Sequence, residues 1–384
     1  MKKALATILA LVMALGLTTA AWADGVTCEG GESCTHAAAF NGKHYASLVD
    51  AYAALTRGTT KPTTAEVITL LKDSSGGGIG SDTDTNMNYV IDFNGYTYTA
   101  GEPTVGSTGT VTQALRVLQT STAKFMNGTL KAANYNGLAQ VVHTYGDVTF
   151  ENFNVDAREN SYAQIAVEPD CGTLNITGNS SILAREGETG LYVAFWHTGT
   201  YNGTTVNVNT TGKITGKLVY EFDEDMTGDA AATENKAVLN IDNGNFEITG
   251  IQTLFSGVAN EALKEAKIEV SGGTFSTDVT EYLAEGKILQ KNGDTYTAVT
   301  NSGITSGTYT SEPTVPSGYK ATKNDDGTWT VSKVSYYYYQ PTTDTKTTDT
   351  KGSPKTFDAG IALYVGMALT SAAGVAFVGK KRED

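Results

Sequence analysis

Short runs in which hydrophobic and polar residues alternate recur along most of the chain. In "LNIT" at 174 and "LNID" at 239, Leu and Ile alternate with polar residues, and a turn rich in Gly or Asn follows. Such alternation predicts a β-strand with one buried face and one exposed face. Segments of this kind can be aligned on Phe93, Phe125, Phe150, Ile176, Val208, Ile241 and Val270.

The aligned positions lie 25 to 33 residues apart, which is the spacing of a repeat architecture. One repeat has too few apolar residues to bury a face alone, so its neighbours must stack on it with parallel strands. We therefore predict an all-β protein whose residues 79–300 form a right-handed parallel β-helix. A β-sandwich of hairpins is the alternative, and it would need shorter spacing and more two-residue turns.

The alternation also predicts which side chains point into the solenoid. The residues expected to face the core are Leu174, Ile176, Val206, Val208, Leu239, Ile241, Ile268 and Val270. The residues expected to face outward between them are Asn175, Asn207, Asn240 and Glu269.

Residues 24–78 precede the first repeat and have the pattern of a cap. Ser47 can N-cap a short helix, and Asp50 adds negative charge to its first turn. Leu48, Tyr52 and Leu55 fall on one face of that helix. We expect the helix to cover the end of the core and "VITLL" to begin the sheet.

The C-terminal part of the solenoid repeats itself. Gly273-Thr274-Phe275 matches Gly307-Thr308-Tyr309, and the match continues over most of both segments, which predicts a closing repeat at 301–335. The motif resembles the closing repeats of β-helical surface proteins of gut Firmicutes. That resemblance implies display on a surface and leaves the ligand open.

The N-terminal residues 1–23 have the three parts of an export signal. Lys2 and Lys3 are followed by the apolar run 4–17, and Ala21 and Ala23 form an A-x-A cleavage site. We expect the mature chain to begin at Asp24.

Residues 336–356 begin with four tyrosines. From residue 340 on they contain only Thr, Asp, Lys, Gly, Pro, Ser and Gln, a composition that predicts a disordered spacer. The following segment, 357–384, contains an uncharged run at 359–379 that is long enough to cross a bilayer. Basic residues follow the run and would stay in the cytoplasm. We therefore expect a C-terminal transmembrane helix with a basic tail.

The junction before this run resembles the cell-wall sorting signal of Gram-positive surface proteins. Ser353, Pro354, Lys355, Thr356 and Phe357 occupy the slots of Leu-Pro-x-Thr-Gly; Pro354 and Thr356 match, whereas Ser353 and Phe357 depart from the motif. The resemblance implies sortase and a peptidoglycan precursor as partners, and a location on the cell wall. The alternative is a plain anchor in the membrane, with the body on its extracellular face.

Composition narrows the partners. The chain has 27 basic and 41 acidic residues and a net charge of −14, which excludes nucleic acid and disfavours polyanionic glycans unless a cation bridges them. Cys28 and Cys34 are close enough in sequence to form a disulfide, whereas Cys171 is expected to be a buried apolar residue. We predict no metal site and no cofactor.

Between the aligned segments lie further short strands, such as "LAQVVHTY" at 138. We call these the second strands of the repeats, and polar residues lie at similar places in several of them. His143 and Glu168 lie at similar places in successive repeats and would come within contact distance, with Trp196, His197 and Glu221 nearby. These residues are a candidate ligand face for a sugar or for acid–base chemistry. The alternative is that they are unrelated core and surface residues.

The sequence thus favours an exported β-helix that acts as an adhesin or contacts glycans or a host surface without catalysis. No catalytic residue is assigned. A polysaccharide lyase or glycoside hydrolase of the pectin-lyase-like type is the first alternative, because β-helices also carry such enzymes. A structural spacer without a ligand is the second.

Overall fold

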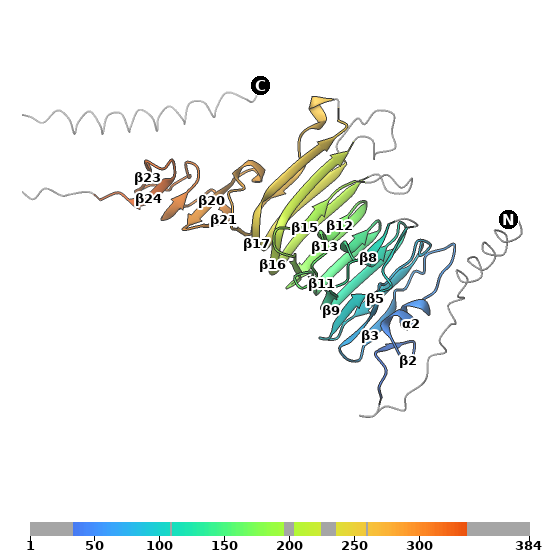
Figure 1. Cartoon of the computed structure of the whole chain (residues 1–384). Helices are drawn as coiled ribbons and strands as arrows, with labels where there is room; N and C mark the ends of the chain where they lie inside the picture. The colour runs from blue at the N-terminus through green and yellow to red at the C-terminus, as the bar shows by residue number, and fades with distance from the viewer. Residues whose placement is uncertain (1–33, 108–109, 196–202, 224–235, 259, 336–384) are drawn as a thin grey trace, which may run out of the picture. The chain divides into compact units, whose positions relative to one another are not determined.

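The computed structural model describes residues 34–107, 110–195, 203–223, 236–258 and 260–335 (Figure 1). These residues form an all-β solenoid of about six turns with almost no helix. The predicted β-helix is therefore confirmed as a fold. The signal peptide, the spacer 336–356 and the segment 357–384 lie outside the described residues, and those predictions stand untested.

The cap contains the expected helix and the expected strand at "VITLL", and two further strands precede them. Strands β1 (Ala38–Phe40) and β2 (Lys43–Tyr45) precede helix α2 (Leu48–Ala53), and β3 (Glu66–Leu70) follows it. β1 pairs antiparallel with both β2 and β3. This small sheet closes the N-terminal end of the solenoid, where an uncovered strand edge would otherwise invite pairing with another chain.

The sequence predicted the details of the capping helix correctly. The Oγ atom of Ser47 accepts a hydrogen bond of 3.0 Å from the backbone N–H of Asp50. Leu48, Tyr52 and Leu55 are all buried against the core. Capping and burial of one face together stabilise a helix too short to be stable alone.

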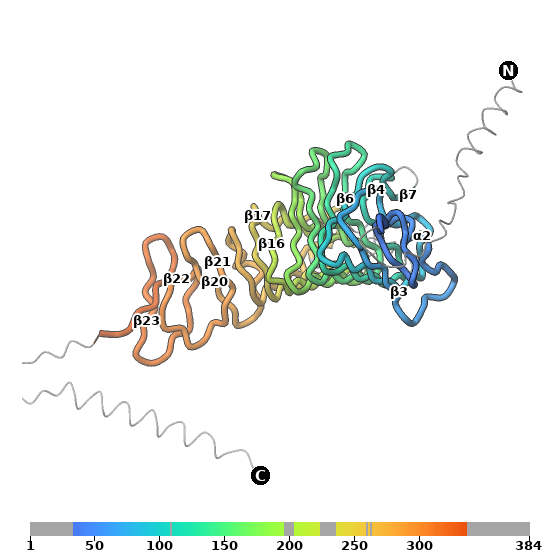
Figure 2. Tube along the Cα trace, turned by 90° about the horizontal axis from the view of Figure 1, so that it is seen from below, coloured from blue at the N-terminus to red at the C-terminus, as the bar shows by residue number. Residues whose placement is uncertain are grey.

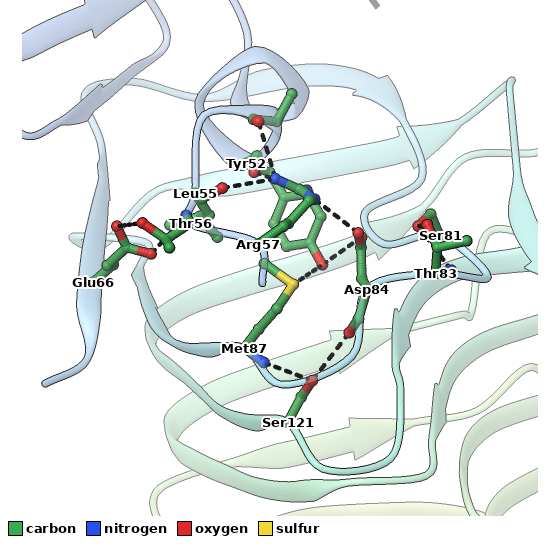
Figure 3. Close-up of polar contacts among 11 residues, drawn as sticks. Tyr52, Leu55, Thr56, Arg57, Glu66, Ser81, Thr83, Asp84, Met87 and Ser121 are labelled. Carbon is green, nitrogen blue, oxygen red and sulfur yellow. Dashed lines mark hydrogen bonds and ion pairs between the residues drawn. The ribbon is translucent and has the colours of Figure 1, made fainter. Parts of the chain in front are cut away.

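Asp84 joins the cap to the first coils (Figure 3). One of its carboxylate oxygens accepts a hydrogen bond from the Tyr52 hydroxyl at 3.0 Å, and the other lies 2.8 Å from Nε of Arg57. The Ser121 hydroxyl donates to the backbone carbonyl of Asp84 at 3.0 Å. The guanidinium of Arg57 also lies over the Tyr52 ring, 5.2 Å from its centroid. Asp84 therefore connects the helix, the loop after it and the coil that carries Ser121.

The parallel coils follow β3 in sequence order (Figure 2). The strands that stack on β3 to form the first face are β5 (Asn88–Asp92), β9 (Thr122–Ala132), β11 (Asp147–Asp156), β13 (Gly172–Gly178), β16 (Thr204–Asp223), β17 (Ala237–Ser256) and β18 (Ile268–Val270). The remaining elements of the coils are β4 (Ser74–Gly77), β6 (Thr97–Gly101), β7 (Val105–Ser107), β8 (Thr110–Val117), β10 (Gln140–Thr144), β12 (Ile165–Pro169), β14 (Ser181–Leu183), β15 (Thr189–Val193) and the short 3-10 helix η2 (Glu261–Leu263).

The predicted register is confirmed for all but the first aligned position. The residues that pair from coil to coil are Phe125, Phe150, Ile176, Val208, Ile241 and Val270. In the first coil Ile91 pairs with Phe125, so the alignment on Phe93 was wrong by two residues. Phe93 is buried at the bend before Asn94 and Gly95, which both have positive φ. A shift of two residues keeps the same face of a strand buried, so the alternation alone could not detect it.

The predicted inward and outward positions are confirmed as well. The eight inward residues from Leu174 to Val270 are buried, and the four outward residues are half-buried or exposed. The outward asparagines also form a ladder: Asn207 donates to Asn175 and Asn240 donates to Asn207, both at 2.9 Å. Each amide thus satisfies its neighbour in the next coil, as in other stacked asparagine arrays.

Antiparallel hairpins end the solenoid. Strand β19 (Thr274–Phe275) pairs parallel with β17 on one side and antiparallel with β21 on the other, so the pairing changes there. The elements that follow β19 are η3 (Thr280–Tyr282), β20 (Lys287–Asn292), β21 (Thr295–Thr300), β22 (Gly307–Tyr309), β23 (Tyr319–Lys323) and β24 (Trp329–Lys333). β22 pairs with β24 as β19 pairs with β21, which confirms that the two aligned segments are structural repeats.

The membrane-spanning helix predicted at 359–379 is not among the residues described. Within the described part of the chain, no helix has the length and apolar character that crossing a bilayer requires.

Candidate functional site

The second strands of the coils carry the polar constellation. β8, β10, β12 and β15 pair in parallel, with Leu115, Val142, Val167 and Leu191 in line and buried. The residue before each of the first three is also buried, so two neighbouring side chains point inward. This interruption of the alternation places Gln140 and His143, three residues apart, on the same outer side, where Gln113 contacts both.

His143 is held by hydrogen bonds on both ring nitrogens. Its Nε2 lies 2.7 Å from the carboxylate of Asp170, and its Nδ1 lies 3.0 Å from the amide nitrogen of Gln113. The side chains of His143 and Asp170 are each only 8% exposed. With Gln113 donating to Nδ1, the neutral imidazole carries its proton on Nε2 and donates it to Asp170.

Charge and burial shift the pKa values of this group. Burial lowers the pKa of His143, but the hydrogen bond and charge of Asp170 and the charge of Glu168 outweigh it, so the net shift is upward. Burial, together with the negative charges of Asp170 and Glu221, raises the pKa of Glu168 to about 7, although His143 acts in the opposite direction. Glu168 therefore exchanges its proton near neutral pH.

A row of half-buried polar side chains lies beside His143 and Asp170 and extends across successive coils. We call Gln140, Glu168, Tyr192 and Glu221 the polar strip. Gln140 donates a hydrogen bond to Glu168, and the Tyr192 hydroxyl donates to Glu221 at 2.5 Å. Ser256, in the next coil, donates to the other oxygen of Glu221 at 2.8 Å. Each member is half-buried and comes from a different coil.

Arg116 flanks the histidine on the N-terminal side. It pairs with His143 in the strand register. Its Nη2 donates to the Ser107 hydroxyl at 2.7 Å, and the guanidinium lies 5.5 Å from the centroid of the Tyr145 ring. Its Nε and Nη1 are buried without a hydrogen-bond partner in the described part of the chain. Buried donors of this kind are normally satisfied by water or a ligand.

The structure brings together some of the residues that the sequence singled out. His143 and Glu168 are register partners, as expected from their places in the repeats. Glu221 joins the same face through Tyr192, whereas Trp196 and His197 lie outside the described residues. The carboxylate that contacts His143 is that of Asp170, which the sequence reasoning missed. Asp170 lies two residues after Glu168, just beyond the end of β12, and the alternation of side chains along the strand was the available signal.

The cysteine predictions have separate outcomes. Cys171 is buried and donates its thiol proton to the backbone carbonyl of Tyr145 at 3.1 Å, which fits the expected core role. Cys28 lies outside the described residues, so its disulfide with Cys34 stays a prediction. The sorting residues Ser353–Phe357 and the cleavage residues Ala21 and Ala23 also lie outside them.

This arrangement allows three kinds of chemistry. Histidine held by a carboxylate, beside a glutamic acid that titrates near neutrality, suits proton transfer. The amide, carboxylate and phenol groups of the polar strip suit hydrogen bonds to sugar hydroxyls. His143, Glu168 and Asp170 also each offer a ligand atom within 4.8 Å of the others, close enough to share a cation.

Comparisons with protein-family models, curated proteins and solved structures found no match to this chain. The site therefore has to be interpreted from its own geometry.

Replacing Glu168 with glutamine is expected to stabilise the protein at alkaline pH relative to the wild type. Because the folded-state pKa of Glu168 is raised, the stability that it contributes is present below its ordinary pKa of 4.5 and is lost as pH rises through about 7. Glutamine cannot ionise, so the variant should gain on the order of 1 kcal/mol over the wild type between about pH 5 and pH 8. Thermal unfolding midpoints across that range test the difference.

Glu269→Gln, at an exposed outward position of β18, is the matched control and should follow the wild-type pH profile. Parallel pH profiles for wild type and Glu168→Gln would contradict the raised pKa of Glu168.

Proposed function

We propose that this protein is displayed outside the cell and contacts a glycan through the polar strip without catalysis. The export signal, the spacer and the uncharged segment with its basic tail support display. In this proposal the C-terminal segment either remains a membrane anchor or is exchanged by a sortase for a link to peptidoglycan. We also propose that the coils wind in the right-handed sense that is usual for parallel crossovers.

The observation that carries the binding proposal is the polar strip itself. Gln140, Glu168, Tyr192 and Glu221 come from successive coils, and strands of neighbouring coils are about 4.8 Å apart. Hydrogen-bonding groups from four successive coils and a phenol ring suit a linear saccharide that runs along the stack of coils. The partial exposure of these side chains suits a shallow binding groove open to an extended chain.

The negative charge of the polar strip limits the class of glycan that it can bind. Glu221 and the partly ionised Glu168 repel polyuronates and sulfated glycans, and the whole chain has a net charge of −14. We therefore propose a neutral glycan as the ligand.

Replacing Tyr192 with alanine is expected to weaken binding by about tenfold or more, measured with the neutral glycan that the wild type binds most tightly. The variant loses a ring surface and the hydroxyl that holds Glu221 in place. A glycan array with the purified full chain would identify the ligand, and titration calorimetry would compare the variants.

Tyr162→Ala is the matched control, because Tyr162 is an exposed tyrosine in the loop after β11 and outside the strip. Equal affinities of the Tyr192→Ala variant and the wild type would overturn the polar strip as the binding surface. The absence of any glycan ligand would favour the structural spacer instead.

A polysaccharide-cleaving enzyme is the second candidate, and the His143–Asp170 pair beside Glu168 favours it. A carboxyl group with a pKa of about 7 can donate a proton to a leaving sugar at neutral pH. Release of reducing ends or unsaturated uronate from pectins, mucin glycans or hemicelluloses, with and without calcium, would reveal such activity. Turnover that is lost in both His143→Ala and Glu168→Gln would place the enzyme ahead of the binding protein.

A further inference from the structure

The β1–β2 hairpin brings three metal-ligating residues together at the start of the solenoid. The hairpin turns at Asn41 and Gly42, which both have positive φ, as a two-residue turn between antiparallel strands requires. His44 lies on β2 opposite Ala39, while Cys34 and His36 lie on the chain that leads into β1. The tight turn therefore returns His44 to the segment that enters the sheet.

The ligand atoms of these residues converge on one point. Sγ of Cys34 lies 3.0 Å from Nδ1 of His44 and 3.4 Å from Nδ1 of His36. All three residues offer a ligand atom within 4.8 Å of the others, and all are half-buried. In a tetrahedral zinc site, bonds of about 2.3 Å to sulfur and about 2.0 Å to nitrogen separate sulfur from nitrogen by about 3.5 Å. The observed separations need to widen by only a few tenths of an ångström to admit the ion.

We propose that Cys34, His36 and His44 bind a zinc ion that fastens the start of the solenoid. One thiolate and two imidazoles form a ligand set that favours zinc over calcium or magnesium, which prefer oxygen ligands. The cluster of His143, Glu168 and Asp170 fits zinc less well, because its ligands are mainly carboxylates and its histidine already bonds Asp170 and Gln113.

Such an ion would act on stability at the N-terminal end. It would tie the segment before β1 to strand β2, on which the packing of the cap depends. Removing the metal should therefore loosen the first strands before the later coils, since each coil of a solenoid contacts mainly its neighbours.

The test measures metal content and ligand type in the purified full chain. After loading with zinc under reducing conditions and desalting, mass-spectrometric metal analysis should find about one zinc ion per chain. Cys34→Ser and His44→Ala should lose nearly all of it, whereas Lys43→Ala on the same strand and His143→Ala should retain it. Cobalt in place of zinc should give a thiolate-to-metal absorption band that disappears in Cys34→Ser.

Three results would overturn the proposal. The first is a wild-type chain that retains no zinc although its circular dichroism shows a folded β-protein. The second is zinc retained in Cys34→Ser but lost in His143→Ala, which would assign the ion to the other cluster. The third is peptide mapping of the exported protein that finds Cys34 oxidised in a disulfide with Cys28 and no bound zinc.

Discussion

The Ile241→Asp variant is expected to be less stable than the wild type by about 4 kcal/mol or more. Ile241 is fully buried in the column of inward side chains, between Val208 of the preceding coil and Val270 of the next. An aspartate there would leave a carboxylate in an apolar core, with the space of the lost methyl groups around it. The expected drop in the thermal unfolding midpoint is on the order of 10 °C.

Val238→Asp supplies the matched control for this variant. Val238 lies on the same strand, three residues earlier, and its side chain faces outward and is half-buried. The same change from a β-branched apolar residue to aspartate should cost only about 1 kcal/mol there. Similar losses for Val238→Asp and Ile241→Asp in circular-dichroism melts would contradict the inward and outward assignment.

The repeat structure was predictable because the same alternation of apolar and polar residues recurs in almost every coil. Alternation over Leu239, Asn240 and Ile241 fixes the buried face, and the recurrence of the pattern fixes which residues pair between coils. The failure at Phe93 has a simple cause: Ile91 and Phe93 are two residues apart and both buried, so alternation alone does not distinguish them. The asparagine ladder was not predicted, although its three members had been assigned correctly to the outer face.

The polar site was harder to predict than the fold. Two adjacent inward residues, such as Val141 and Val142, break the alternation, so the sequence did not show whether His143 faces outward. The partner of His143 depends on side-chain direction, and Asp170 reaches it from two residues beyond its register partner Glu168. Register follows from repeats, but such contacts depend on local bends that the repeat pattern does not encode.

The cluster of Cys34, His36 and His44 was also hard to predict, because the contacts among these side chains depend on local geometry. Cys34 and His36 are separated by one residue, whereas His44 follows eight residues later across the Asn-Gly turn. Neither spacing matches a common zinc motif. The Asn-Gly pair between two short segments was the signal that predicts a hairpin, and the hairpin brings His44 back to Cys34.

Replacing Asp84 with asparagine is expected to destabilise the N-terminal cap by about 2–3 kcal/mol. The Asp84 side chain is 5% exposed and binds both Arg57 and the Tyr52 hydroxyl. Without its negative charge, the Arg57 guanidinium keeps its place beside the core but loses its counter-ion. Breaking a buried pair by removing one partner costs about 3–5 kcal/mol, and the 30% exposure of Arg57 reduces that figure here.

The location of the destabilisation in Asp84→Asn tests the role of Asp84 as well as its magnitude does. Because Asp84 connects α2 to the first coils, the variant should open the cap before the rest of the solenoid unfolds. Hydrogen exchange should therefore become faster in Leu48–Ala53 than in β16 and β17, where the wild-type rates should persist. Asp82→Asn is the matched control, since Asp82 is exposed and lies two residues away in the same loop. If exchange in α2 were unchanged in Asp84→Asn, the contacts of Asp84 would not be what holds the helix on the solenoid.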